Sequence, residues 1–226
     1  MTAPPGTPAL DARDLYRFFH AGDEETFALR GVSLSIRSGE MIAILGPSGS
    51  GKSTLLGCLA GLDEPDGGTV RIAGERLTRR SEAERARMRA SGVGVLMQSG
   101  NLLEHLSVRD NVEFAQRVAG SPDVGRVHDL LARAGLEGRA AARPSALSGG
   151  EAARAGLAVA LANDPTVLLA DEPTGELDRA HESMVLELLM DLARAGGAVC
   201  VVTHSDPVAH VADRVVRLAD GRIVDA

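Results

Sequence analysis

The chain has 226 residues, of which 44% are apolar, and this composition favours one large packed domain over a disordered chain. Its formal net charge of −7 argues against nucleic-acid binding, because phosphate backbones attract basic surfaces. The sequence has no run of about 18 apolar residues, so we expect no segment that spans a membrane. Cys58 and Cys200 lie in apolar runs, and we expect both to be buried, reduced thiols.

The first third of the chain reads as short strands around one glycine-rich loop. Residues 32–36 alternate between apolar and polar side chains, whereas 41–46 is a continuous apolar run of the kind found in buried parallel strands. This run leads directly into "GPSGSGKST" and then into a helix expected over 53–62. A further strand with a turn is expected over 69–77.

Helical patterns dominate from about 81 to 163, after which strands return. An apolar run over 92–98 predicts one strand inside this helical stretch. The helices expected there cover 82–90, 108–120, 123–136 and 151–164. The later elements are a strand, a helix, a strand and a hairpin, over 166–171, 181–196, 198–204 and 214–226. The hairpin is expected to turn at Asp220-Gly221, and the whole order predicts an α/β fold with a helical insertion.

The loop over 46–54 holds the only lysine of the chain, Lys52, among 24 lysine and arginine residues. Its glycines allow successive N–H groups to point at one phosphate, and the following helix adds its positive end. Ser53 can offer a hydroxyl to Mg²⁺, and Thr54 can donate to an α-phosphate. A compact ammonium fits between β- and γ-phosphates, whereas a planar guanidinium needs a wider approach. The pattern predicts a nucleoside triphosphate site made of Gly46, Pro47, Ser48, Gly49, Ser50, Gly51, Lys52, Ser53 and Thr54.

Further polar residues follow apolar strands. Asp171 ends the strand over 166–171 and suits Mg²⁺, whereas Glu172 can polarise an attacking water. The segment "LSGGE", residues 147–151, begins a helix, and its glycines expose N–H groups at the positive helix end. Taken alone, this segment also fits an ordinary capping box. Gln98 and His204 each end an apolar strand and indicate little by themselves.

Taken together and in this order, these segments resemble the ATP-binding cassette (ABC) ATPases, the nucleotide-binding subunits of ABC transporters. The resemblance covers the chain from about residue 10 to the end, including the D-loop segment "GELD" over 175–178. It implies a P-loop fold with a mixed core sheet, a helical subdomain and an antiparallel β region. It also implies one ATP-binding domain over 1–226, with its core at about 9–80 and 164–226 and its helical subdomain at about 81–163.

The resemblance implies that the chain binds ATP with Mg²⁺ and hydrolyses ATP. Gln98 would contact Mg²⁺ or the attacking water, and His204 would hold the γ-phosphate. Adenine would stack on an aromatic ring at Phe19, with Phe18 and Tyr16 as alternatives. The signature residues, which would contact the ATP of an opposite subunit in a head-to-tail dimer, are Leu147, Ser148, Gly149, Gly150 and Glu151. The D-loop residues of the site are Glu176 and Asp178.

Within the family, residues 27–56 and 98–112 look like the group of macrolide exporters, lipoprotein-release systems and antimicrobial-peptide exporters. This implies a second ATPase subunit in a homodimer, a separate integral-membrane permease, no nucleic-acid partner, and a peripheral location on the cytoplasmic face of the cell membrane. The alternative is an ATP-gated clamp that acts on a membrane partner without transport. Glu104 and Gly100 depart from the group in the segment expected to face the permease. The apolar side chains expected to contact it are Leu102, Leu103, Leu106 and Val108.

Overall fold

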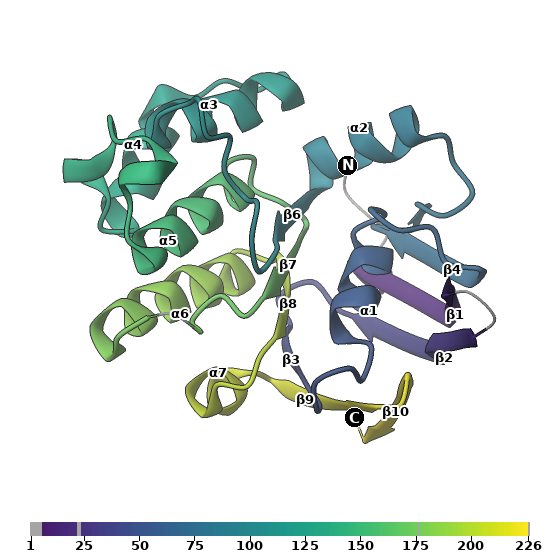
Figure 1. Cartoon of the computed structure of the whole chain (residues 1–226). Coiled ribbons are helices and arrows are strands. Elements are labelled where there is room, and N and C mark those ends of the chain that lie inside the picture. Colours follow the sequence, from purple (N-terminus) through teal and green to yellow (C-terminus); the bar gives the residue numbers. More distant parts are fainter. Residues whose placement is uncertain (1–5, 22–23, 176, 226) are drawn as a thin grey trace.

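The structure, a computed structural model, describes residues 6–21, 24–175 and 177–225 (Figure 1). The strands are β1 (Leu10–Ala21), β2 (Glu24–Ile36), β3 (Met41–Leu45), β4 (Gly67–Ile72), β5 (Glu75–Arg76), β6 (Val93–Leu96), β7 (Val167–Asp171), β8 (Ala198–Val202), β9 (Arg214–Ala219) and β10 (Arg222–Asp225). The α-helices are α1 (Lys52–Leu59), α2 (Glu82–Gly92), α3 (Val108–Ala119), α4 (Val124–Arg133), α5 (Gly149–Ala160), α6 (Arg179–Arg194) and α7 (Asp206–Val211). Two 3-10 helices, Glu137–Arg139 and Pro144–Ala146, lie between α4 and α5.

The central sheet has six strands in the order β10-β9-β3-β8-β7-β6. Five neighbouring strands run parallel, and only β10 is antiparallel to its neighbour β9, so the sheet is mixed as expected. The strands β7 and β8 are buried along their whole length, which explains why their sequences are continuous apolar runs. The carboxyl ends of the parallel strands lie on one edge of the sheet. The glycine-rich loop, Gln98 and His204 follow these ends, and Asp171 is the last residue of β7.

A second, four-stranded sheet, in the order β2-β1-β4-β5, is antiparallel throughout. The predicted strand over 32–36 is only the end of β2, and β1 was not predicted. In β1 the buried side chains of Leu10, Ala12 and Leu15 do not keep an even spacing. Between Ala12 and Leu15 the pairing with β2 shifts register, and Asp14 adopts a φ of 50°. This bulge shifts the alternation by one residue and so conceals the strand.

Apolar side chains form two clusters, one on each face of the central sheet. The first joins α1 and the antiparallel sheet to one face, and the second joins α3 to α7 to the other, as the two sides of Figure 1 illustrate. Cys58 and Cys200 are free thiols buried in the first cluster, which confirms the expectation. Burial raises the pKa of both thiols to about 12.

The helical stretch contains α2 to α5 as expected, and β6 within it pairs with β7 in the central sheet. Because β6 lies inside this stretch yet belongs to the central sheet, the boundaries of the helical subdomain at about 81–163 stay a prediction. The hairpin turn is confirmed, because Asp220 and Gly221 both have positive φ, as a tight two-residue turn requires. Within the described part of the chain, no helix combines the length and the apolar character needed to cross a membrane.

Candidate functional site

The glycine-rich loop encloses the side chain of Lys52, which is only 9% exposed. Its Nζ donates to the carbonyl oxygens of Gly46 at 2.7 Å and Pro47 at 2.9 Å. An ammonium has three N–H donors, so one remains for an anion in the loop. The lysine therefore stands where it can bind a phosphate without leaving the loop.

Two glycines of this loop have no room for a side chain. A Cβ at Gly51, whose φ is 101°, would lie 2.3 Å from the carbonyl oxygen of Ala28 in β2, and a Cβ at Gly46 would lie 2.1 Å from the carbonyl oxygen of Leu218. The Oγ of Ser50 is buried and has no hydrogen-bond partner among the described residues. An unpaired buried hydroxyl inside a loop of this shape fits a bound phosphate oxygen.

The loop and the end of β7 meet at Ser53 and Asp171. The hydroxyl of Ser53, near the start of α1, donates to Oδ2 of Asp171 at 2.8 Å. Asp171 is buried, and its carboxylate is therefore held in one place at the edge of the sheet. A hydroxyl and a carboxylate oxygen beside a phosphate site are the hard oxygen ligands that Mg²⁺ prefers. The residues present thus fit a magnesium ion.

Glu172 turns away from Asp171 toward the end of β8. Its φ is 49°, in the left-handed region that is costly for a residue with a side chain. Its Oε2 accepts from Thr203 Oγ1 at 3.2 Å and from the backbone N–H of His204 at 3.3 Å. Its Oε1 lies 3.6 Å from Nε2 of His204. The two carboxylates therefore contact different parts of the site, Asp171 at Ser53 and Glu172 at the end of β8, although the residues are adjacent in sequence.

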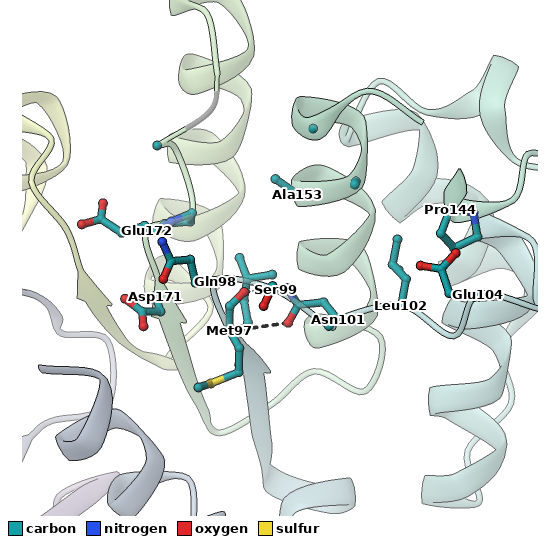
Figure 2. Close-up of a pocket in the computed structure, with 16 residues that line it drawn as sticks. Met97, Gln98, Ser99, Asn101, Leu102, Glu104, Pro144, Ala153, Asp171 and Glu172 are labelled. Atoms are coloured by element: carbon teal, nitrogen blue, oxygen red, sulfur yellow. Dashed lines mark hydrogen bonds between the residues drawn. The ribbon is translucent and has the colours of Figure 1, made fainter. Parts of the chain in front are cut away.

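Gln98 lies in a groove of about 560 Å³ that also contains Asp171 and Glu172. Figure 2 shows Gln98 and these two carboxylates at one end of the groove, with Glu104 and Pro144 at the other. The backbone before Gln98 is held by Asn101, which accepts from the N–H of Met97 at 2.8 Å and donates to its carbonyl at 2.6 Å. Asn101 was not predicted, and its place directly after a glycine was the available signal.

A second groove of about 360 Å³ lies beside the first and shares Asn101 with it. Its walls are mostly apolar, and they include four large apolar side chains that are exposed: Leu62, Leu103, Phe114 and Val118. One expected contact residue is corrected here. Val108 is fully buried in the core of the helical stretch, because it is the first residue of α3 and faces inward.

The signature segment forms the start of α5. Ser148 caps this helix, and its side chain accepts from the N–H of Glu151 at 3.2 Å while the Glu151 carboxylate accepts from the N–H of Ser148 at 2.9 Å. The capping box is therefore present. The Ser148 N–H and Arg139 lower the pKa of the Glu151 carboxyl. Ser148 and Gly149 remain exposed, and they line a pocket of about 460 Å³ with Leu177 and Asp178.

Of the two expected D-loop residues, the structure describes Asp178. Asp178 caps α6 by accepting from the N–H of His181 at 3.0 Å, and this bond lowers the pKa of the Asp178 carboxyl. Glu176, the other expected D-loop residue, lies outside the described residues. Leu147 packs against the apolar cluster that contains α5 and α6.

Of the three aromatic candidates, Tyr16 is 45% exposed, and Phe19 and Phe18 differ in their contacts. Phe19 is 42% exposed, and the guanidinium of Arg17 lies 4.7 Å from the centre of its ring. Phe18 packs on Phe27, with ring centres 5.9 Å apart. Phe19 pairs with Thr26 in β2, two residues before the Ala28 carbonyl that meets Gly51. Two residues of strand span about 7 Å, so Phe19 stays close to the loop.

The structure thus brings the loop, Gln98, Asp171, Glu172 and His204 to one edge of the central sheet, and it places the signature at the start of a separate helix. A loop of this kind between a parallel strand and a helix, with carboxylates ending a nearby strand, defines a P-loop nucleoside triphosphatase. The chain belongs to the ABC transporter family, because the model of that family matches residues 29–175. It is an ABC-type ATPase, as the sequence predicted.

Known proteins agree with this assignment. The chain is 43% identical over 223 residues to the probable export ATP-binding/permease protein MacB of Pseudomonas entomophila, covering 97% of this chain and 33% of that protein. It is 42% identical over 222 residues to the macrolide export ATP-binding/permease protein MacB of Azoarcus sp., covering 97% of this chain and 34% of that protein. The chain therefore spans about a third of the length of these curated relatives.

Among solved structures, the dimeric ATP-binding cassette MJ0796 bound to ADP and Pi is similar, with a TM-score of 0.92 and 34% identity. The match covers 96% of this chain and 97% of that one. A second dimeric structure of MJ0796 gives the same TM-score of 0.92 at 35% identity. These likenesses confirm the predicted fold class.

Proposed function

We propose that this chain binds ATP with Mg²⁺, hydrolyses it within a homodimer, and drives an integral-membrane permease of the exporter type. The observation that carries the proposal is the carboxylate of Glu172, held between Thr203 and His204 and next to the Ser53–Asp171 pair. These groups and the glycine-rich loop lie at one edge of the sheet, which supports their proposed roles as base, magnesium site and phosphate-binding loop. Hydrolysis of the β–γ bond needs all three.

Each residue has one part in the reaction. Lys52 and the loop N–H groups bind the β- and γ-phosphates, and adenine stacks on Phe19. Mg²⁺, held by Ser53 and Asp171 with Gln98, would supply positive charge to the phosphate oxygens. Glu172 takes a proton from the attacking water. At the same time the water oxygen bonds to the γ-phosphorus, and the bond from the γ-phosphorus to the β–γ bridging oxygen breaks. His204 stabilises the charge on the phosphoryl group, and ADP and Pi are released.

The dimer is supported by the exposed start of α5 and by the related cassette. MJ0796 is dimeric in both of its structures, and one of them is a post-hydrolysis state bound to ADP and Pi. In this chain Ser148 and Gly149, at the start of α5, are exposed. The positive end of α5 can therefore bind the γ-phosphate of a nucleotide held by a second subunit.

The permease is supported by the apolar groove and by the names of the relatives. Monomeric proteins seldom expose several large apolar side chains together, and such patches mark interaction sites. Leu62, Leu103, Phe114 and Val118 form such a group at one groove. The relatives are ATP-binding/permease proteins named for export. We infer that a short permease segment binds this groove and holds the chain at the cytoplasmic face of the membrane.

The Glu172→Gln variant tests the proposed function. We expect it to bind ATP, to hydrolyse it about a hundredfold more slowly, and to accumulate as a dimer, because the amide keeps the shape of the carboxylate but does not take a proton. Turnover is measured by phosphate release, and assembly by size-exclusion chromatography with ATP and Mg²⁺. Glu75→Gln, the same change at an exposed residue of β5, is the matched control and should behave as wild type.

A Glu172→Gln variant that stays monomeric in ATP, while the wild-type chain hydrolyses ATP, would contradict the dimeric site. Normal hydrolysis by this variant would contradict the assigned base.

A further inference from the structure

Thr203 follows the last residue of β8 and is fully buried. The preceding residues Val199 and Val201 point to the same face of the sheet, where they pack in the apolar cluster that contains α3 to α7. A valine would continue that pattern at the same volume. A buried hydroxyl is costly unless it is hydrogen-bonded, so the bonds of Thr203 require an explanation.

The Thr203 hydroxyl makes two hydrogen bonds whose directions are fixed. It accepts from the backbone N–H of Ser205 at 2.9 Å and lies 3.2 Å from Oε2 of Glu172. An amide N–H only donates, and an ionised carboxylate only accepts. The single hydroxyl hydrogen must therefore point at Glu172.

The backbone around Thr203 is also held by hydrogen bonds to other elements. The hydroxyl of Ser205 donates to Oε1 of Glu182 in α6 at 2.8 Å, and Ser205 also caps α7. The Thr203 N–H donates to the carbonyl of Ile44 in β3 at 3.2 Å. The oxygen that faces Glu172 is thus held by β3, α6 and α7 together.

We propose that Thr203 is a positioning residue for Glu172, an inference that rests on the proposed role of Glu172 as the base. Its hydroxyl and the His204 N–H both donate to Oε2, and this holds the carboxylate in one orientation. Oε1, for which the described part of the chain offers only the His204 side chain at 3.6 Å, is then the oxygen presented to the attacking water. A general base accelerates a reaction more when it is held in the reactive geometry before the reaction begins.

If Thr203 served only to shape the chain after β8, one of its two hydrogen bonds would be sufficient. A threonine that accepts from the N–H two residues later forms a local turn, and such a turn ends many strands. That turn requires only the bond from Ser205. The bond to Glu172 is additional, and the two roles can be separated by experiment.

The test compares pairs of side chains that differ mainly by the hydroxyl: Thr203 with Thr203→Val, and Thr203→Ser with Thr203→Ala. We expect loss of the hydroxyl to lower kcat about tenfold in both pairs, while KM and the affinity for a fluorescent ATP analogue stay within about twofold. Thr203→Ser should keep most of the wild-type turnover. If Thr203→Val fails to fold, the Ser and Ala variants still isolate the hydroxyl.

The double variant Glu172→Gln/Thr203→Val gives a readout that a structural role would not produce. If Thr203 acts through Glu172, this variant hydrolyses ATP no more slowly than Glu172→Gln alone. A further tenfold loss, or equal losses in Thr203→Ser and Thr203→Val, would overturn the proposal. Unchanged turnover in Thr203→Val would overturn it too. Normal hydrolysis by Glu172→Gln would instead contradict the proposed function.

Discussion

Lys52 illustrates how much depends on the shape of one cationic group. Its nitrogen is a single point with three donors, two of which meet the carbonyls of Gly46 and Pro47 inside the loop. A guanidinium spreads its donors over a plane and cannot turn them in these directions from one atom. The loop therefore holds a lysine in a chain whose other cationic side chains, apart from histidine, are all arginine.

We expect Lys52→Arg to lower kcat/KM for ATP by about a hundredfold, close to the loss in Lys52→Ala, because the retained charge cannot enter the loop. Steady-state phosphate release measures both. Arg13→Lys, the opposite exchange at a side chain that is 72% exposed, is the control and should leave turnover unchanged. Wild-type turnover in Lys52→Arg would mean that charge alone matters at this position.

At the same scale, the sequence predicted most of the residues that meet at the edge of the sheet. Lys52, Gln98, Glu172 and His204 follow strands and Asp171 ends one, and the order of these residues along the chain can be read from the sequence. Thr203 could not be predicted in this way, because its partner Glu172 follows another strand and only the parallel pairing of β7 with β8 brings them together. A threonine at the end of a valine-rich strand is otherwise unremarkable in sequence.

At the scale of elements, the glycine-rich loop is shaped by two neighbours from distant parts of the chain. The carbonyl of Ala28 in β2 lies against Gly51, and the Gly221 N–H of the β9–β10 turn donates to the carbonyl of Ser50 at 3.0 Å. The carbonyl of Gly221 accepts in turn from the Arg30 N–H of β2 at 2.8 Å. The antiparallel sheet and the last hairpin thus hold the loop in place before any nucleotide binds.

Gly51→Ala should therefore destabilise the protein even without nucleotide. The Cβ would lie 2.3 Å from the Ala28 carbonyl, in a backbone conformation with φ of 101° that suits glycine. We expect the free energy of unfolding to fall by about 3 kcal/mol. Chemical denaturation measures this change. Gly138→Ala, at an exposed glycine with no atom within 4 Å of the added Cβ, is the control and should change stability by less than about 0.5 kcal/mol.

Equal stability of the Gly51→Ala and Gly138→Ala variants would mean that the loop can move away from β2. The sequence alone could not predict this contact, since β1 and the first part of β2 were not predicted as strands. Their register is set by the bulge near Asp14 and by pairing with β4, neither of which leaves a regular pattern in the residues. The short helix α7, with six residues, was missed because its pattern is too brief to show a period.

At the scale of the whole molecule, the two grooves lie on either side of one short segment. Gln98 faces the first groove with Glu172, whereas Leu103 lines the second with Phe114. Asn101 lines both and bonds to the backbone of Met97 in two places. A displacement of Leu103 by a bound partner would therefore be carried to Gln98 through backbone that is already held. In this way, binding of the proposed permease at Leu103 can affect the position of Gln98 beside Glu172.

The last prediction separates that contact from catalysis. Phe114 is 46% exposed on α3, at the apolar groove and away from the residues proposed to bind ATP. We expect Phe114→Arg to leave basal ATP hydrolysis unchanged, because the side chain faces solvent, and to weaken binding to the permease about tenfold or more, because a charge would enter an apolar contact. The permease that co-purifies with the wild-type chain is the binding partner, in detergent. Val124→Arg, at an exposed residue of α4 outside the groove, should change neither quantity. If Phe114→Arg binds the permease as well as Val124→Arg does, the partner binds another surface, and a loss of basal hydrolysis would show that Phe114 supports the fold instead.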